Sequence, residues 1–261
     1  MAALTRFWLR AVAWLNAHLK SAAVRLTRVT GKSRVPIHPK HLINEDLGQH
    51  WYLDYVEAGM QVLDVGCGNG MHGIHVAGRG ATVAGLDYDP RQLQAGRALI
   101  AERGVIAVSF VLGSAEETLP FKAGQFDLVL ALDVIEHLDR RDAALREIHR
   151  VLKRHGLLLV AAPKRDTSWK KRQQKAGLFY YSDPDHRIEY TETGLRQELE
   201  RNGLTVQQVL PVVLDTPWAG LIDLVGGFSL GLYRRLVRWK QREAQRRPEE
   251  SIGFRAVCLK E

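Results

Sequence analysis

The stretch Val62-Leu63-Asp64-Val65-Gly66-Cys67-Gly68-Asn69-Gly70 decides the fold class of this 261-residue chain. Its mainly apolar beginning is typical of a buried strand, and the alternating glycines that follow predict a turn before a helix. Glycine is needed in such a turn because a ligand then approaches the backbone more closely than a Cβ atom permits. The stretch therefore predicts a strand, a ligand-binding loop and a helix, which is the first unit of a parallel α/β sheet.

Two acids indicate which kind of ligand the loop binds. Asp87 stands at the end of the next predicted strand, where a carboxylate accepts hydrogen bonds from both hydroxyls of a ribose. A dinucleotide loop would need a third glycine at Met71, and Asp64 is unsuited to a pyrophosphate, which requires donors and positive potential. Asp64 instead suits a ligand with an ammonium group. The alternative is a tight structural turn beside two solvated acids.

Short apolar runs and helical patterns alternate through the rest of the chain, as in a parallel α/β sheet. Segment 164–190 is predicted to be irregular and to contain a basic cluster. The predicted strands are 61–65, 82–86, 108–112, 126–132, 157–162, 205–210 and 254–259, and the predicted helices are 71–79, 90–103, 141–152 and 191–202.

These features resemble the class I S-adenosylmethionine-dependent methyltransferases that carry D-x-G-x-G-x-G, which is Asp64 to Gly70 in this chain. The likeness extends over residues 60–210 and includes Gly113-Ser114-Ala115-Glu116 and Leu132-Asp133-Val134-Ile135-Glu136-His137-Leu138. It implies a Rossmann-like α/β fold, with a doubly wound, seven-stranded, mostly parallel sheet. It also implies N-terminal helices, an amphipathic insertion before the last strand, and an enzyme that uses S-adenosylmethionine as its methyl donor.

The resemblance also implies which residues contact this cofactor. Asp64 is expected beside its methionine part, and Asp87 at its ribose. Ser114 stands where the family usually has an acid, so the contact to the adenine amino group comes from Ser114 or moves to Glu116. The implied cofactor-binding set is Asp64, Gly66, Cys67, Gly68, Gly70, Asp87, Tyr88, Ser114, Ala115 and Leu132.

Asp133, Glu136 and His137 are candidate metal ligands, because a helical turn would place residues at i, i+3 and i+4 on one face. Quinone-biosynthesis O-methyltransferases have a similar acid-x-x-Glu-His arrangement, which is associated with a divalent metal, and oxygen ligands favour Mg²⁺. The alternative is that Glu136 and His137 orient the helix and the cofactor loop without any metal.

Two histidines are candidates for the proton transfer that methylation of an oxygen requires. His186, in Asp185-His186-Arg187, is the stronger candidate for a general base because imidazole titrates near neutral pH. His137 is the second candidate. The alternative for His186 is a structural hydrogen bond to the backbone of a lid.

The charge of the chain is concentrated in its flanks. The net charge is +8, and residues 1–44 contain eight Lys and Arg but no Asp or Glu. We expect basic amphipathic N-terminal helices at 1–44 and a methyltransferase domain at 45–261, with a lid at 164–190 and an insertion at 211–251. Trp8 and Leu15 in the first segment, and Phe228 and Trp239 in the insertion, belong to apolar stripes near Lys and Arg. Such helices lie in anionic membrane interfaces, unless they pack on the sheet or on each other.

The sequence also limits the location of the protein. No segment is predicted to span a membrane or to act as a secretory signal. Cys67 and Cys258 form no zinc or redox pattern, which suits a reducing compartment. We expect a cytoplasmic protein that binds membranes peripherally, while the acid-free, Arg-bearing start also fits an organelle transit peptide.

The sequence therefore favours methyl transfer to an oxygen of a small lipophilic acceptor, such as a prenylated phenol or quinone precursor, at a membrane surface. One alternative is a sugar or glycolipid held by the basic cluster of the lid. Another is a non-catalytic binding module that retains the methyltransferase fold. Nucleic acid is disfavoured as a partner because the basic residues lie in the flanks and no N/D-P-P-Y motif follows the fourth strand.

Overall fold

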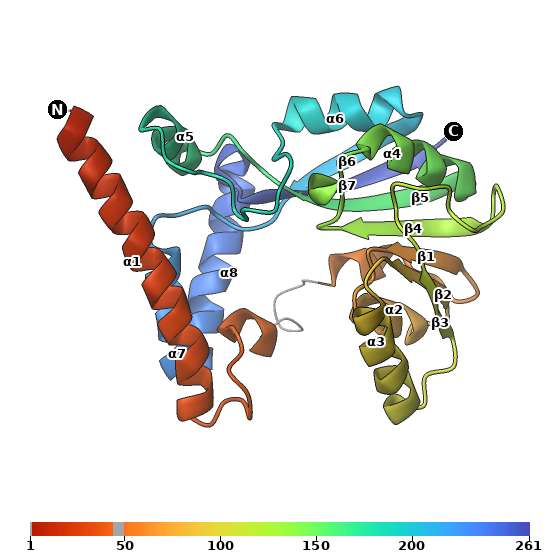
Figure 1. Ribbon diagram of the computed structural model, residues 1–261, viewed down its shortest axis with the longest axis horizontal. Helices are drawn as coiled ribbons and strands as arrows, with labels where there is room; N and C mark the ends of the chain where they lie inside the picture. Colours follow the sequence, from red (N-terminus) through yellow and green to blue (C-terminus); the bar gives the residue numbers. More distant parts are fainter. Residues whose placement is uncertain (1, 44–49) are drawn as a thin grey trace. The chain divides into compact units, whose positions relative to one another are not determined.

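The computed structural model describes residues 2–43 and 50–261 of the chain (Figure 1). Within these residues, seven strands form one sheet in the order β3-β2-β1-β4-β5-β7-β6, in which β7 is antiparallel. This order confirms the predicted seven-stranded, mostly parallel α/β fold. The strands are β1 Gln61–Val65, β2 Thr82–Asp87, β3 Val108–Leu112, β4 Phe126–Leu132, β5 Leu152–Pro163, β6 Leu204–Pro211 and β7 Gly253–Lys260.

Two of the helices between these strands begin after a residue whose side chain caps them. Before α3, the side chain of Asp89 accepts a hydrogen bond from the backbone N–H of Arg91, and Gly104 ends the helix in the left-handed conformation. Thr191 caps α6 in the same way, through the N–H of Gly194. The elements are η3 Trp51–Tyr55, α2 Met71–Ala77, α3 Pro90–Arg103, η4 Ile135–His137, α4 Arg141–Val151 and α6 Glu192–Arg201.

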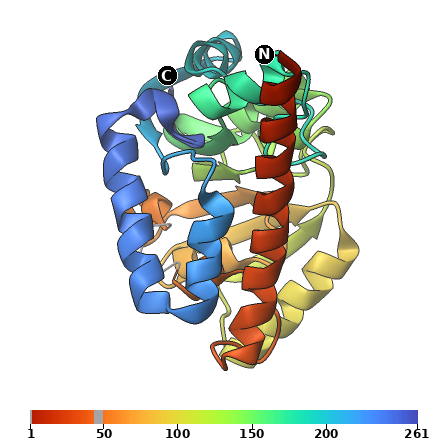
Figure 2. The same ribbon diagram turned by 90° about the vertical axis from the view of Figure 1, so that its left-hand side faces the viewer.

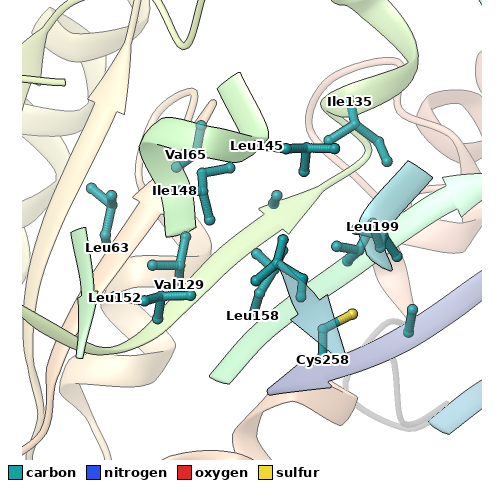
Figure 3. Packing of buried hydrophobic residues seen from close by; sticks show 14 of the residues in the cluster. Leu63, Val65, Val129, Ile135, Leu145, Ile148, Leu152, Leu158, Leu199 and Cys258 are labelled. Carbon is teal, nitrogen blue, oxygen red and sulfur yellow. The ribbon is translucent and has the colours of Figure 1, made fainter. Parts of the chain in front are cut away.

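Helices cover both faces of the sheet, and each face has its own apolar core. Leu63 and Val65 of β1 lie in the cluster that contains α4 and α6, whereas Val62 lies in the cluster that contains η3 and α2. Figure 3 shows the first cluster from close by. Neighbouring residues of a strand point to opposite faces, so the almost continuous apolar runs of β1 and β4 are explained by burial on both sides.

The chain divides into two compact units, which we describe separately. Unit 2 contains the sheet and consists of residues 51–163, 183–210 and 254–261. Unit 1 consists of residues 1–50, 164–182 and 211–253, as far as they are described. Unit 1 thus contains most of the three predicted segments outside the core of the methyltransferase domain, which are the N-terminal segment 1–44, the lid 164–190 and the insertion 211–251. No described helix of either unit has the length and apolar character that a membrane crossing requires.

Unit 1 is built around the contact of α1 (Ala2–Val29) with α7 (Ala219–Phe228) (Figure 2). A Cβ atom at Gly220 would lie 2.6 Å from the backbone oxygen of Asn16, and one at Gly227 would lie 2.7 Å from Cβ of Leu26. The two helices therefore run in the same direction, and the glycines allow their backbones to approach closely. Helix α8 (Leu230–Arg246) and the short η1 (Pro39–Leu42) and η5 (Pro248–Glu250) complete this part of the unit.

The prediction that 164–190 is irregular is wrong at α5 (Ser168–Lys175). Thr167 caps this helix through the N–H of Lys170. The ammonium of Lys170 is buried and donates to the backbone oxygen of Lys164 and to Oγ of Ser182. This part of the basic cluster therefore stabilises unit 1 from within, instead of forming a charged surface.

Candidate active site

The glycine loop after β1 has the backbone that the sequence predicts. Gly66, Gly68 and Gly70 have φ angles of 67°, 52° and 77°, a region that strains other residues. A Cβ atom at Gly66 would lie 2.6 Å from Val134, and one at Gly70 would lie 2.5 Å from Phe110. At Gly68, by contrast, the nearest atom is 3.9 Å away, on Gln92. The loop thus packs closely on the protein at two glycines and leaves space for a ligand at the third.

Asp87, at the end of β2, holds this loop. Its Oδ2 accepts a hydrogen bond of 2.8 Å from the N–H of Gly68, and its Oδ1 accepts one of 2.8 Å from the N–H of Asp89. The side chain is 7% exposed. A carboxylate oxygen has two acceptor sites, so each oxygen of Asp87 retains one for a ribose hydroxyl.

Asp64 lies in β1, just before the loop, and is 2% exposed. Burial and the nearby charge of Asp87 raise the pKa of Asp64 to about 7, although the N–H of Gly73 acts in the opposite direction. Its buried Oδ2 has no hydrogen-bond partner in the protein. A buried acceptor without a partner costs free energy, and the ammonium group of a ligand would satisfy it.

The other predicted cofactor residues lie around this edge of unit 2. Cys67 is buried, Tyr88 is largely exposed, and Leu132 ends β4 beside β1. Ser114 accepts a hydrogen bond from the N–H of Glu116, and Ala115 packs against the core beneath. The carboxylate of Glu116 accepts from the N–H of Arg140, so Glu116 is already engaged.

Glu136, His137 and His186 form a cluster beyond the end of β4. The ligand atoms that these three side chains offer all lie within 4.8 Å of one another. The rings of His137 and His186 meet edge to face, with their centroids 4.8 Å apart. Val134 joins this cluster to the glycine loop, because it precedes η4 and packs on Gly66.

The predicted helical face of Asp133, Glu136 and His137 is wrong. Only residues 135–137 form a turn, of the 3₁₀ type, and Asp133 lies before it with a φ of 56°. Asp133 therefore does not share a helical face with Glu136 and His137. The cluster of possible ligands contains His186 in its place. This histidine comes from a segment nearly fifty residues later, and no local spacing indicates that it would meet Glu136.

Glu136 is the buried acid of this cluster, with 1% of its surface exposed. Burial, followed by the negative charges of Asp133 and Glu189, raises the pKa of Glu136 to about 8, although its own backbone N–H acts in the opposite direction. Its Oε2 has no hydrogen-bond partner in the protein. Glu136 is therefore mostly protonated at neutral pH unless a cation or a hydrogen-bond donor approaches it.

Sequence reasoning missed two residues near these groups. Glu189 is fully buried and lies with Oε1 3.0 Å from Nδ1 of His186. Tyr52, in η3, is buried, and its hydroxyl lies 2.8 Å from Nδ1 of His72 in α2, immediately after the glycine loop. The three-residue spacing of His186 and Glu189 was the only local signal, and an acid in a polar segment gives no periodic pattern.

Comparisons with known proteins agree with this geometry. Residues 63–160 match the model of a family described as "Methyltransferase domain". The chain is 36% identical over 109 residues to a ubiquinone biosynthesis O-methyltransferase of Pseudomonas aeruginosa, which covers 42% of this chain and 47% of that protein. It is 30% identical over 200 residues to a 2-methyl-6-phytyl-1,4-hydroquinone methyltransferase of Synechocystis, which covers 69% and 60%. The chain thus spans about half the length of the first curated relatives it matches.

Solved structures share the fold at lower sequence identity. A SAM-dependent methyltransferase from Aquifex aeolicus aligns with a TM-score of 0.58 at 16% identity, over 84% of this chain and 93% of that one. The [4+2]-cyclase SpnF aligns with a TM-score of 0.58 at 20% identity, over 81% and 80%. Because a cyclase has this fold, the fold alone does not specify the reaction. The family match, which includes the glycine loop and the end of β4, assigns the chain to the class I S-adenosylmethionine-dependent methyltransferases.

Proposed function

We propose that this protein transfers the methyl group of S-adenosylmethionine to an oxygen of a small lipophilic acceptor, such as a prenylated phenol. The observation that carries this proposal is the cluster of Glu136, His137 and His186 beside the glycine loop. It supplies a base where a hydroxyl has to lose a proton. The names of two relatives, for ubiquinone biosynthesis and for a phytyl hydroquinone, support the choice of acceptor.

In this reaction the protein aligns the acceptor oxygen, the methyl carbon and the sulfur for an in-line displacement. His186 is the proposed general base and His137 its neighbour on the acceptor side. The imidazole of His186 takes the hydroxyl proton as the oxygen attacks, so that full negative charge does not develop on the oxygen. Removal of water from the site also strengthens these polar interactions.

A metal is compatible with the same cluster. Glu136 has an unpaired buried oxygen, and two imidazoles lie beside it. Adjacent ligands of one ion lie about 3–3.5 Å apart, so the three side chains would need to move closer, by about an ångström, to bind one ion directly. One carboxylate with two imidazoles suits zinc, iron or manganese better than the Mg²⁺ expected from the sequence. Such an ion would lower the pKa of a bound phenol and so assist loss of its proton.

Two other functions fit the chain less well. A sugar or phosphorylated head held by the basic cluster of the lid is disfavoured because Lys164 and Lys170 are buried and engaged within unit 1. A non-catalytic module is disfavoured because the glycine loop is intact and both Asp64 and Glu136 retain unpaired buried oxygens. Groups of that kind are costly to keep without a ligand.

The outward face of α1 supports a lipophilic acceptor and an anionic membrane surface as partners. On the opposite face of this helix, Ala23 and Thr27 are fully buried, and Oγ1 of Thr30 donates to the backbone oxygen of Gly227 in α7. The outward face leaves Phe7, Trp8 and Trp14 between 63% and 68% exposed. The described side chains of α1 include several arginines and no acid. Aromatic residues among arginines are typical of helices that lie in the headgroup region of anionic bilayers.

We expect the protein to float with vesicles that contain anionic lipid, and less with neutral vesicles, because the arginines are attracted to negative headgroups. Trp8→Ser with Trp14→Ser should weaken this binding about tenfold or more, since two large apolar side chains no longer enter the interface. Ile106→Ser is the matched control, because Ile106 is an exposed apolar residue of unit 2. Protein that stays in the soluble fraction with every vesicle would refute membrane binding.

The reaction is tested with labelled S-adenosylmethionine and two pools of acceptors, a lipid extract and an aqueous metabolite extract. We expect label in a phenolic lipid, as an ether that resists the mild base that cleaves methyl esters. Label only in water-soluble products would refute the lipophilic acceptor, and calorimetry without any S-adenosylmethionine binding would favour the non-catalytic module.

We expect the affinity for S-adenosylmethionine to fall as the pH is lowered through about 7, the pKa of Asp64. Below this pH the carboxyl is neutral and no longer attracts the ammonium group of the cofactor. The loss approaches tenfold per pH unit well below the pKa. Calorimetry across this range with Asp64→Asn as the control should give a flatter profile for the variant. Parallel profiles would mean that Asp64 does not bind the ammonium.

A further inference from the structure

The backbone fixes the position of His186 relative to Glu136. The N–H groups of Arg187 and Ile188 both donate to the backbone oxygen of Glu136, at 2.7 and 3.3 Å. The N–H of Tyr190 donates to the backbone oxygen of Pro163, at the end of β5. The segment 186–190 is therefore tied by backbone hydrogen bonds to η4 and to the end of β5, and these bonds fix the position of His186.

The side chain of Glu189 bears on which nitrogen of the His186 ring carries the proton. Oε1 of Glu189 lies 3.0 Å from Nδ1 of His186, and the histidine side chain is only 9% exposed. A carboxylate oxygen and a bare ring nitrogen are both acceptors, so a proton has to lie between them. With an ionised Glu189 and a neutral ring, that proton is on Nδ1, and Nε2 presents its lone pair.

Burial of the Glu189 carboxylate costs free energy, and a merely structural role would not require a charged group there. Glu189 is completely buried and lies close enough to Glu136 for its charge to contribute to the raised pKa of that residue. Two acids buried near each other oppose folding unless other interactions compensate. A glutamine at 189 would accept the same hydrogen bond without the charge. Costly charges of this kind gather at functional sites.

We propose that Glu189 is a positioning residue that holds His186 in the Nδ1–H tautomer and directs Nε2 toward the acceptor hydroxyl. The inference rests on the proposed function. In the reaction, the acceptor O–H bond breaks and its proton passes to Nε2, while an oxygen lone pair forms the new bond to the methyl carbon. The bond between that carbon and sulfur breaks, its electron pair stays on sulfur, and S-adenosylhomocysteine leaves. Glu189 then faces an imidazolium, whose positive charge it stabilises.

The first test is ¹⁵N NMR of the full chain with labelled histidine, because the ring-nitrogen shifts distinguish the two tautomers. We expect Nδ1–H for His186 in the wild-type protein. Glu189→Met, of similar size but with only a weak thioether acceptor, should move the ring toward the Nε2–H form. Glu192→Gln is the matched control, since Glu192 lies three residues away, is exposed and pairs with Arg196.

The second test compares turnover. We expect kcat to fall about tenfold in Glu189→Gln and about a hundredfold in Glu189→Met, the lower range for loss of a positioned base. The affinity for S-adenosylmethionine should not change. Should Glu189→Met fail to fold, Glu189→Gln carries the test alone.

The outcomes separate the two proposals. An Nε2–H tautomer in the wild-type protein, or variants that keep both the wild-type tautomer and the wild-type kcat, would overturn the role of Glu189. Absence of methylation with every phenol would instead overturn the proposed function. The NMR result would then still decide whether Glu189 fixes the ring.

Discussion

Asp87→Ala is expected to lower the affinity for S-adenosylmethionine about a hundredfold or more. The variant removes the acceptor of two ribose hydroxyls, and hydrogen bonds to a charged group contribute about 1.5–3 kcal/mol each. It also removes the acceptor of the Gly68 N–H, so that the loop loses a link to β2. Both effects act on the same ligand, and the loss should exceed that of any single ribose contact.

Calorimetry measures this loss, and a thermal melt checks that the variant is folded. Glu102→Ala is the control, because Glu102 is an exposed acid on α3, away from the loop. Asp87→Asn should lie between the wild type and Asp87→Ala, since an amide retains one acceptor oxygen. If Asp87→Ala binds the cofactor within a few-fold of the wild type, our assignment of the ribose contact is wrong.

His186→Gln is expected to lower kcat about 10²- to 10⁴-fold, the usual contribution of a positioned general base. Glutamine retains polarity but takes no proton at neutral pH. The affinity for S-adenosylmethionine should remain close to that of the wild type, because His186 lies beside the acceptor in this proposal. His155→Asn is the control, since His155 is an exposed residue of β5 with a φ of 63° that asparagine tolerates.

A chelator separates the two roles that His186 is able to play. If EDTA leaves turnover unchanged, the metal is excluded and His186 acts as the base. If EDTA abolishes turnover and zinc or manganese restores it, Glu136, His137 and His186 hold an ion instead. Turnover that survives in His186→Gln would refute both roles.

The sheet and the glycine loop were predictable because their signals are local. Buried strands such as β1 and β4 appear as apolar runs, and Gly66 and Gly70 are required by the backbone conformation and by contacts with neighbouring side chains. Helix α3 was correct at both ends because Asp89 and Gly104 cap it. In each case a short segment contains the physical cause of its own structure.

The candidate catalytic cluster was only partly predictable because its members meet through the tertiary fold. His186 was identified as a base, but its contacts with His137 and Glu189 depend on hydrogen bonds to the backbone of Glu136. Helix α5 was missed because its sequence is almost entirely polar and has no apolar stripe. Asp133 was misplaced because a 3₁₀ turn replaced the expected α-helical turn.

The close contact of α1 with Gly220 and Gly227 has a consequence for biosynthesis. Helix α1 is translated before the glycines against which it packs, which follow about two hundred residues later. During that interval, the face of the helix that is buried in the folded protein, at Ala23 and Thr27, lacks its final partner. The nascent chain therefore exposes a long amphipathic helix throughout synthesis of the sheet, and a chaperone that binds apolar segments has its longest opportunity there.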